Sequence, residues 1–324
     1  MEYTRFGSTD LQVSRVCFGT FPLGGAWGDY DEEVALETLR TAHELGINFF
    51  DTAQAYGFGR AEELLARALA DQIRAHRDEV VLATKGGLRV EGGRRLRDSS
   101  PGWLRRGLEE SLRHLGTDYV DLYQVHWPDP RTPVEETATV MADFVQEGKV
   151  RYVGVSNFDA GQMGAFEKTR KLDSLQPPYS LFVRDIEREL LPYCQAHHIA
   201  VFVYGPLAHG LLAGGFSADT TFSANDWRSK NAGFLGEGLR RNLQVVEKLQ
   251  GLAQARGCSV AQLAVAWTLA NPAVDVAIVG ARRPEHLAET AAAVELRLSE
   301  ADRREIEEIM AEAEPFKEPS PETV

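Results

Sequence analysis

Short apolar runs alternate with stretches of helical periodicity along nearly the whole chain, and this alternation constrains the fold more than any other feature. Eight apolar runs are separated mostly by helical patterns of about ten to fifteen residues. Parallel strands need a long crossover, usually a helix, so we expect parallel strands with helices packed outside them. Eight such units favour a closed (β/α)8 TIM barrel over an open, doubly wound sheet.

The expected elements follow one another without a linker. The strands are predicted at residues 16–20, 48–51, 80–85, 119–127, 150–156, 174–176, 200–204 and 276–280. The helices are predicted at 31–45, 61–73, 101–115, 133–147, 159–170, 187–197, 239–256, 260–270, 284–293 and 299–313. We also expect a hairpin at 3–14, a long irregular segment at 207–238 and an extended tail at 315–324. Residues 1–324 are therefore predicted to form one domain.

Composition excludes several classes of protein. Lys and Arg number 35 against 48 Asp and Glu, a net charge of −13, which disfavours nucleic-acid binding. Cys17, Cys194 and Cys258 are far apart and have no metal-ligand spacing, so we expect three reduced thiols and no metal. No apolar run approaches the ~20 residues that span a bilayer, and the first residues do not resemble a signal peptide. We expect a cytoplasmic protein, monomeric or a small homo-oligomer.

Four residues with chemically useful side chains lie at or just after the ends of successive expected strands. Asp51 ends the second strand, Tyr56 lies in the loop after it, Lys85 ends the third and His126 lies near the end of the fourth. A barrel gathers the carboxyl ends of its strands at one face. Singly, each residue is more often a cap, a solvated charge or a core side chain, so their joint placement is the evidence.

This group would suit proton donation to a carbonyl oxygen. Tyrosine has a reference pKa of about 10. A cation about 4 Å away contributes roughly 4 kcal/mol at an effective dielectric of 20, so Lys85 is expected to lower the pKa of Tyr56 by about three units. Asp51 would hold Lys85 in place, and His126 would orient the substrate oxygen.

The whole chain resembles an aldo-keto reductase. The matching segments are Asp51-Thr52-Ala53-x-x-Tyr56-Gly57, Ala83-Thr84-Lys85, Asp121-Leu122-x-x-x-His126 and Gly154-Val155-Ser156-Asn157-Phe158. The segments 124–130 and 176–179 are most similar to the bacterial stress-protein and inositol-dehydrogenase-like branch. The resemblance implies a (β/α)8 barrel, NADPH as hydride donor, a small carbonyl substrate, and Asp51, Tyr56, Lys85 and His126 as the catalytic tetrad.

The resemblance also implies the residues that bind the cofactor. Those placed around the nicotinamide and the pyrophosphate are Thr20, Phe21, Asp51, Ser156, Asn157, Gln176, Tyr204, Gly205, Pro206, Leu207, Ala208, His209, Gly210 and Leu212. Those placed around the adenosine and its 2′-phosphate are Arg228, Gly280, Ala281, Arg282, His286, Glu289 and Thr290. No G-x-G-x-x-G follows the first strand, which argues against a Rossmann dinucleotide site.

The preference between NADPH and NADH stays open. Arg282 suits the 2′-phosphate because its planar fork matches phosphate, although without the resemblance Arg282 and Arg283 are as readily a solvated loop pair. At Gly215, His286 and Thr290 the chain departs from the residues that many family members carry. The lost cation at Gly215 weakens the case for tight NADPH binding and leaves NADH use open.

Two other functions compete with carbonyl reduction. A cofactor-binding sensor or regulatory subunit would keep the tetrad but turn over slowly, and a barrel lyase would form a Schiff base on Lys85. The substrate itself is expected to be set by the loops at 22–30, 86–99, 127–132 and 207–238 and by the tail. The aromatic residues expected to line an apolar pocket there, with ordinary loop packing as the alternative, are Trp27, Phe58, Trp127 and Trp227. The residues Arg94, Arg95 and Arg97 are interpreted as a solvated charge run rather than a clamp for acidic substrates.

Overall fold

The barrel predicted from the sequence is confirmed. The computed structural model describes the chain except residues 26–29, 93, 224–225, 315, 317 and 321–324. Within these described residues, eight strands close into a barrel in the order β10-β11-β12-β3-β4-β5-β8-β9, and neighbouring strands pair in parallel. The barrel strands are β3 (Val16–Gly19), β4 (Phe49–Asp51), β5 (Val81–Gly86), β8 (Val120–Val125), β9 (Val150–Ser156), β10 (Ser174–Gln176), β11 (Ala200–Val203) and β12 (Val276–Val279).

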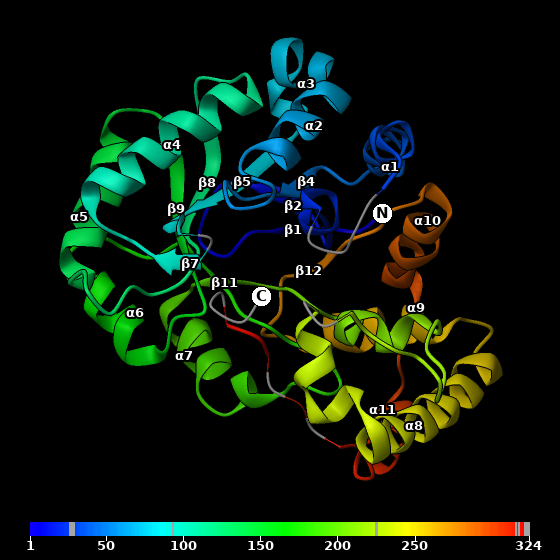
Figure 1. The fold of residues 1–324 in the computed structure, drawn as a ribbon. Coiled ribbons are helices and arrows are strands. Elements are labelled where there is room, and N and C mark those ends of the chain that lie inside the picture. The colour runs from blue at the N-terminus through cyan, green and yellow to red at the C-terminus, as the bar shows by residue number, and fades with distance from the viewer. Residues whose placement is uncertain (26–29, 93, 224–225, 315, 317, 321–324) are drawn as a thin grey trace.

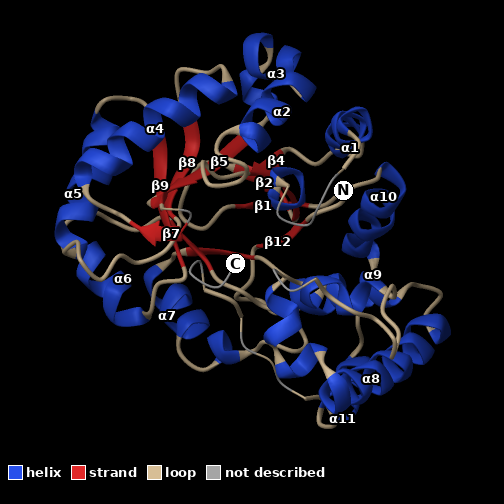
Figure 2. Ribbon diagram, viewed as in Figure 1, coloured by secondary structure: helices blue, strands red, loops and turns tan. Residues whose placement is uncertain are grey.

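Helices surround the strands as a parallel sheet requires (Figure 2). They are α1 (Glu32–Glu44), α2 (Arg60–Ala68), α3 (Ala70–Ala75), α4 (Pro101–Leu115), α5 (Val134–Gln146), α6 (Ala160–Glu167), α7 (Leu190–His197), α8 (Gly236–Ala255), α9 (Val260–Leu269), α10 (Pro284–Ala291) and α11 (Glu300–Met310). The single helix predicted at 61–73 is wrong in one respect. The backbone leaves helical geometry at Leu69, whose side chain is buried, so α2 and α3 are separate.

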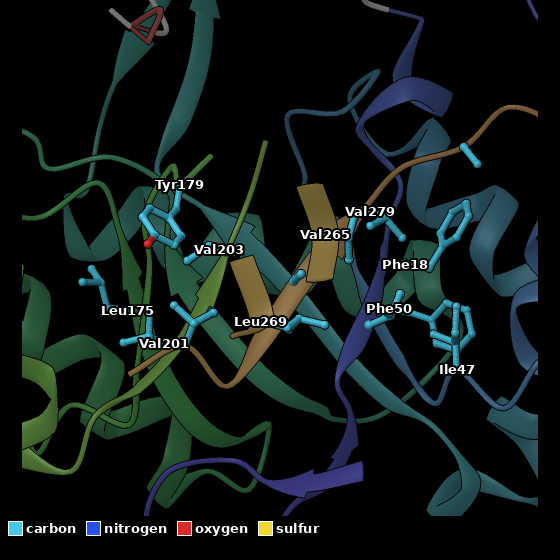
Figure 3. Packing of buried hydrophobic residues seen from close by; sticks show 14 of the residues in the cluster. Phe18, Ile47, Phe50, Leu175, Tyr179, Val201, Val203, Val265, Leu269 and Val279 are labelled. Atoms are coloured by element: carbon cyan, nitrogen blue, oxygen red, sulfur yellow. The ribbon is translucent and has the colours of Figure 1, made fainter. Parts of the chain in front are cut away.

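Alternate residues along the barrel strands face two different hydrophobic layers. Cys17 and Phe49 belong to the cluster inside the barrel, whereas Phe18 and Phe50, one residue further along, belong to the layer between strands and helices. This is the two-residue period of an extended chain. Figure 3 shows part of the outer layer, with Leu269 of α9 among side chains from the strands.

An N-terminal hairpin closes the end of the barrel opposite the site. The predicted hairpin is present as β1 (Tyr3–Arg5) and β2 (Gln12–Ser14), which pair antiparallel. Phe6 lies between them in sequence and contacts Phe49 and Phe202 edge-on, each ring centroid 5.4 Å away. Gly7, next to it, has a positive φ, and a Cβ there would lie only 2.8 Å from the backbone nitrogen of Ala200. This close approach brings the hairpin against the amino end of β11.

Two segments expected as loops contain regular structure. The 86–99 region forms a second hairpin from β6 (Leu88–Glu91) and β7 (Arg94–Arg97). The 207–238 region contains the 3₁₀ helices η4 (Ala208–Ala213), η5 (Trp227–Lys230) and η6 (Ala232–Phe234), and α8 begins before its end. Both segments follow barrel strands at their carboxyl ends, so they shape the mouth. Neither was assigned regular structure in the sequence because arginine-rich and glycine-rich stretches lack a clear period.

The C-terminal tail returns from α11 toward the barrel (Figure 1). Asn242 holds its start through two hydrogen bonds with the backbone of Glu314, and the ring of Phe316 lies 4.8 Å from that of Phe234. Phe316 is buried, which ties the tail to the helical layer. Among the described residues, no helix combines the length and the apolar character needed to cross a bilayer.

A buried carboxylate links α2 and α4 to the strand that carries Lys85. Glu62 is fully buried and accepts a hydrogen bond of 2.6 Å from Thr84 of β5. Its other oxygen lies 3.1 Å from Nδ1 of His114 on α4. The hydrogen bond to Glu62 raises the pKa of His114. A Cβ on Gly59, which precedes α2, would lie 2.3 Å from the His114 ring, so only glycine leaves room for it.

The His114–Glu62 contact predicts a pH-dependent part of stability. Because the pKa of His114 is raised in the folded state, its stabilisation is complete below the unfolded pKa of about 6.5 and is lost as pH rises through the folded value. We expect His114→Gln to lower the free energy of unfolding more at pH 5.5 than at pH 9, measured by urea denaturation. His76→Gln, at a ring that is 59% exposed, is the control. An equal or larger loss at pH 9 contradicts this assignment.

Candidate active site

Barrel topology brings the four predicted catalytic residues to one face. Asp51 ends β4, Lys85 lies at the penultimate position of β5, and His126 directly follows β8. These strands are neighbours in the barrel, so the three residues lie at adjacent carboxyl ends. Tyr56 lies in the loop between β4 and α2 and returns over the same end.

The centre of the group is a buried ion pair between Lys85 and Asp51. Nζ of Lys85 donates to Oδ2 of Asp51 at 2.6 Å, to the backbone carbonyl of Thr52 at 2.9 Å and to the Tyr56 hydroxyl at 3.2 Å. Lys85 is fully buried and Asp51 is 2% exposed. A charge at this depth is tolerated only when it is paired and hydrogen-bonded. All three donor directions of the ammonium are therefore used, and one is aimed at the phenol.

Two glutamines donate hydrogen bonds to the second carboxylate oxygen of Asp51. Oδ1 accepts from Nε2 of Gln176 at 2.8 Å and from Nε2 of Gln124 at 3.4 Å. Burial lowers the pKa of Lys85, but the Asp51 carboxylate and the Tyr56 hydroxyl more than offset it, so its pKa is raised. Lys85 therefore stays a cation across neutral pH. Gln176, which is predicted to contact the cofactor amide, donates its Nε2 hydrogen bond to Asp51 and also lines the cavity.

The pKa of Tyr56 differs from the expectation. Burial raises it above its ordinary value, and the charge and hydrogen bond of Lys85 offset this only in part. The predicted lowering is therefore wrong for the protein alone, because it counted the cation but not the lost solvation. The phenol consequently keeps its proton at neutral pH, which is the state that a proton donor needs.

His126 lies beside the phenol as a neutral ring. Its centroid is 5.6 Å from that of Tyr56, edge-on, and the ring of Phe21 lies 5.2 Å from Tyr56 on another side. Burial, with the charges of Lys85 and Arg95, holds the pKa of His126 well below its ordinary value. Within the described part of the chain its Nδ1 meets no hydrogen-bond partner. A neutral imidazole can donate a hydrogen bond to a substrate oxygen without adding charge.

A cavity of about 320 Å³ opens above these residues. Asp51, Tyr56 and His126 line it, while Lys85 lies behind them. The predicted cofactor residues that line it are Phe21, Asp51, Ser156, Asn157, Gln176, Tyr204, Gly205, Pro206, Leu207, His209, Gly210 and Gly280. The structure therefore brings residues from β9, β10, β11 and β12 to the same space as Tyr56.

A polar chain runs along the wall that β9 and β11 form. The Tyr204 hydroxyl donates to Oδ1 of Asn157 at 2.9 Å, and Nδ2 of Asn157 donates to the carbonyl of His126 at 3.1 Å. Asn157 takes a positive φ of 63°, a conformation that asparagine tolerates better than most residues. Ser156 donates to the carbonyl of Gln176 at 2.8 Å. These contacts fix the amide side chain at the cavity wall.

Other predicted cofactor residues lie outside the cavity. They are Thr20, Ala208, Leu212, Arg228, Ala281, Arg282, His286, Glu289 and Thr290. Ala208 and Leu212 belong to η4, in the segment after β11, and are fully buried. Arg228 binds Asp226 at 2.6 Å and the carbonyl of His209 at 3.0 Å. Burial and the charge of Arg228 lower the pKa of Arg282.

Some pocket residues were missed or misread in the sequence. Arg95 lines the cavity from the β6–β7 hairpin, a position that the sequence pattern did not indicate. Trp127 and Trp227 line it as predicted, whereas Phe58 is 54% exposed and does not. Trp27 lies outside the described residues. The glycine pair after Glu91 is a hairpin signal that could have located β6 and β7.

The tail completes the cavity rim. Glu318, Pro319 and Ser320 line it, and the Glu318 carboxylate lies 2.8 Å from Nε2 of His209, with both side chains 13% exposed. His209 follows Ala208 and precedes Gly210 in a run of three positive φ values. The N–H groups of Ala208 and Gly210 donate to the carbonyls of Gly205 and Leu207, which stabilises this tight turn. Among the described residues no cluster of ligating side chains suited to a metal is found.

Comparison with known proteins agrees with this geometry. The model of the aldo/keto reductase family matches residues 15–311. Aldo-keto reductase YhdN of Bacillus subtilis (strain 168) is 41% identical over 312 residues, which cover 96% of this chain and 94% of that protein. The NADH-specific methylglyoxal reductase of Escherichia coli (strain K12) is 36% identical over 329 residues, covering 97% and 99%.

A solved structure agrees as well. The glycerol dehydrogenase AKR11B4 from Gluconobacter oxydans superimposes with a TM-score of 0.88 at 37% identity, covering 95% of each chain. The fold, the order of the motifs and the similar proteins thus support the same family assignment. The chain therefore belongs to the aldo/keto reductase family, whose members are oxidoreductases that act on small carbonyl compounds with nicotinamide cofactors.

Proposed function

We propose that this protein reduces aldehydes and some ketones to alcohols with NADPH, and that Tyr56 donates the proton. The observation that carries the proposal is the contact of 3.2 Å between the Tyr56 hydroxyl and Nζ of Lys85 at the cavity floor. The Tyr56 hydroxyl keeps its proton because its pKa is raised, and it is hydrogen-bonded to the Lys85 ammonium. The same side chain lines the cavity. A group of this kind suits an oxygen that becomes an alkoxide.

The residues present fit a nicotinamide cofactor. Gly280 lines the cavity, and a Cβ there would lie only 2.9 Å from Pro22, so glycine permits this close packing of the wall. Asn157 and Ser156 offer amide and hydroxyl groups at the wall, and Tyr204 offers an aromatic face. When bound, the nicotinamide supplies a hydride to the carbonyl carbon. Residues 205–212 would hold its pyrophosphate, since Gly205 and Gly210 line the cavity and leave room for a close approach to the backbone.

The protein itself supplies the proton in this reaction. His126 and the Tyr56 hydroxyl hold the carbonyl oxygen between them, and Tyr56 gives its proton as the C–O double bond becomes single. The phenolate that remains faces Lys85 at hydrogen-bond distance, which stabilises its negative charge until solvent returns a proton. Asp51 keeps Lys85 in place through the 2.6 Å ion pair.

Two arginines support a preference for NADPH. Arg282 precedes α10 (Pro284–Ala291), and Arg228 is close enough to affect its pKa. A guanidinium group just before a helix N-terminus suits a 2′-phosphate. His286, Glu289 and Thr290 then flank the adenosine. The Escherichia coli relative carries a name that specifies NADH, so we keep NADH as a second, weaker donor for this chain.

Further features of the protein belong to the same proposal. We propose that residues 1–324 act as one domain, in the cytoplasm, as a monomer or a small homo-oligomer. The names of relatives specify methylglyoxal and glycerol, which supports a small oxygenated carbonyl compound as the substrate. The largely apolar walls, with Trp127 and Trp227, also admit an aromatic aldehyde.

Replacing Tyr56 by Phe tests the proton donor. We expect kcat for reduction of 4-nitrobenzaldehyde to fall by about 10²–10⁴-fold, the usual contribution of general acid catalysis. The dissociation constant for NADPH, measured by fluorescence titration, should stay within about twofold because the ring remains. Tyr3→Phe, at an exposed tyrosine on the hairpin, is the control. A fully active Tyr56→Phe enzyme rejects the role, and single oxidation of cofactor without cycling in the unmodified protein favours the sensor.

Replacing Arg282 by Leu tests the 2′-phosphate site. We expect the dissociation constant for NADPH to rise about tenfold, or by roughly 1.4 kcal/mol, and that for NADH to change less than twofold. The matched control is Arg283→Leu, since Arg283 is exposed and pairs with Glu285 at 3.7 Å. Equal effects on both cofactors would count against a phosphate contact at Arg282.

A further inference from the structure

The C-terminal tail contacts the segment after β11 inside the cavity. Glu318 of the tail and His209 of η4 both line the cavity. The two carboxylate oxygens of Glu318 lie 2.9 and 2.8 Å from Nε2 of His209, and both side chains are 13% exposed. An exposed pair of charged side chains is often a weak, incidental contact, whereas this pair is largely withdrawn from solvent. The Glu318–His209 contact is therefore a specific one.

Further contacts hold each partner in place. The carbonyl of His209 accepts a hydrogen bond of 3.0 Å from Nη1 of Arg228, and its ring lies edge-on to Trp227, with the centroids 4.7 Å apart. On the tail side, the buried ring of Phe316 lies 4.8 Å from that of Phe234 and 6.3 Å from that of His209. The tail is thus anchored two residues before Glu318.

The contact lies where the proposed function puts the cofactor. His209 belongs to the segment 205–212 that would hold the pyrophosphate, and it directly precedes Gly210, which lines the cavity. Burial raises the pKa of Tyr204 well above its ordinary value, and the negative charge of Glu318 adds to this rise. Tyr204 is the residue whose aromatic face would meet the nicotinamide. The charge of Glu318 therefore acts on the same wall that would bind the dinucleotide.

Glu318 and a pyrophosphate would compete at this wall for two reasons. Both are anions, and like charges a few ångströms apart in a largely buried site repel each other. In addition, Nε2 of a histidine ring carries at most one hydrogen, so while it donates to the Glu318 carboxylate it cannot donate to a phosphate oxygen. A dinucleotide gains His209 as a donor only after Glu318 has left it.

We propose that the contact of Glu318 with His209 is autoinhibitory: it keeps the cofactor pyrophosphate out of the groove, and the dinucleotide binds only after the carboxylate has moved away. The inference rests on the proposed position of the cofactor. Phe316 does not line the cavity, so it stays in place while residues 318–320 move. The tail thus remains attached to the helical layer in both arrangements.

Replacing Glu318 by Ala tests the competition. We expect the dissociation constant for NADPH, measured by fluorescence titration, to fall about tenfold, the change expected if the open arrangement is about a tenth of the unmodified protein. In stopped-flow measurements, the observed binding rate of the unmodified protein should level off as NADPH rises, because opening of the contact becomes limiting. In Glu318→Ala the rate should rise linearly over the same range.

Two further variants separate the contact from the general charge of the tail. Glu314→Ala removes a carboxylate that lies earlier in the tail and pairs with Arg241 at 3.4 Å, so it should bind NADPH as the unmodified protein does. Glu318→Gln keeps the shape of the side chain but loses its charge, and it should give part of the gain.

Three results would contradict the proposal in different ways. An unchanged dissociation constant in Glu318→Ala overturns the inference, and a higher one overturns it as well, since the tail would then stabilise the bound cofactor. In both cases the proposed reduction stands. If neither the unmodified protein nor any variant binds NADPH or NADH, the proposed function fails and the inference fails with it.

Discussion

The buried ion pair of Lys85 and Asp51 is the interaction on which the rest of the site depends. Removing either partner would leave an uncompensated charge inside the barrel, at a cost of about 3–5 kcal/mol. The pair is nevertheless useful because it holds an ammonium group 3.2 Å from the Tyr56 hydroxyl, where it stabilises a phenolate formed in the reaction. Gln124 and Gln176 satisfy the remaining carboxylate oxygen, so the geometry is held from four strands at once.

The barrel and the position of this pair could be predicted because both follow from simple periodicity. Apolar runs separated by helical stretches lead to parallel strands, and parallel strands gather their carboxyl ends. Asp51, Lys85 and His126 therefore meet although they are spread over three strands. The family resemblance placed Asn157 and Tyr204 at the cofactor, and both line the cavity just after the ends of β9 and β11. In each case the position of the strand in the barrel determines where the residue at its end lies, so its side-chain contacts need not be known.

Other features of the site could not be predicted, because they depend on side-chain packing and solvation, which a sequence pattern does not reveal. Arg95 faces the cavity because β6 and β7 pair and turn over the mouth, while the exposed Arg94 beside it does not. The pKa of Tyr56 is raised because burial outweighs the charge of Lys85, and burial is known only once the fold is known. Glu318 contacts His209, which lies 109 residues earlier in the sequence. No local sequence pattern predicts such a long-range contact.

The central claim is that the buried cation makes Tyr56 an effective proton donor, and the rate of hydride transfer tests it most directly. The rate is measured by stopped-flow in a single turnover at saturating cofactor, in a variant carrying both Lys85→Met and Asp51→Asn. This variant removes the two charges together and leaves no lone charge in the core. The account predicts a rate at least about a hundredfold below that of the unmodified enzyme. A rate within twofold would contradict it.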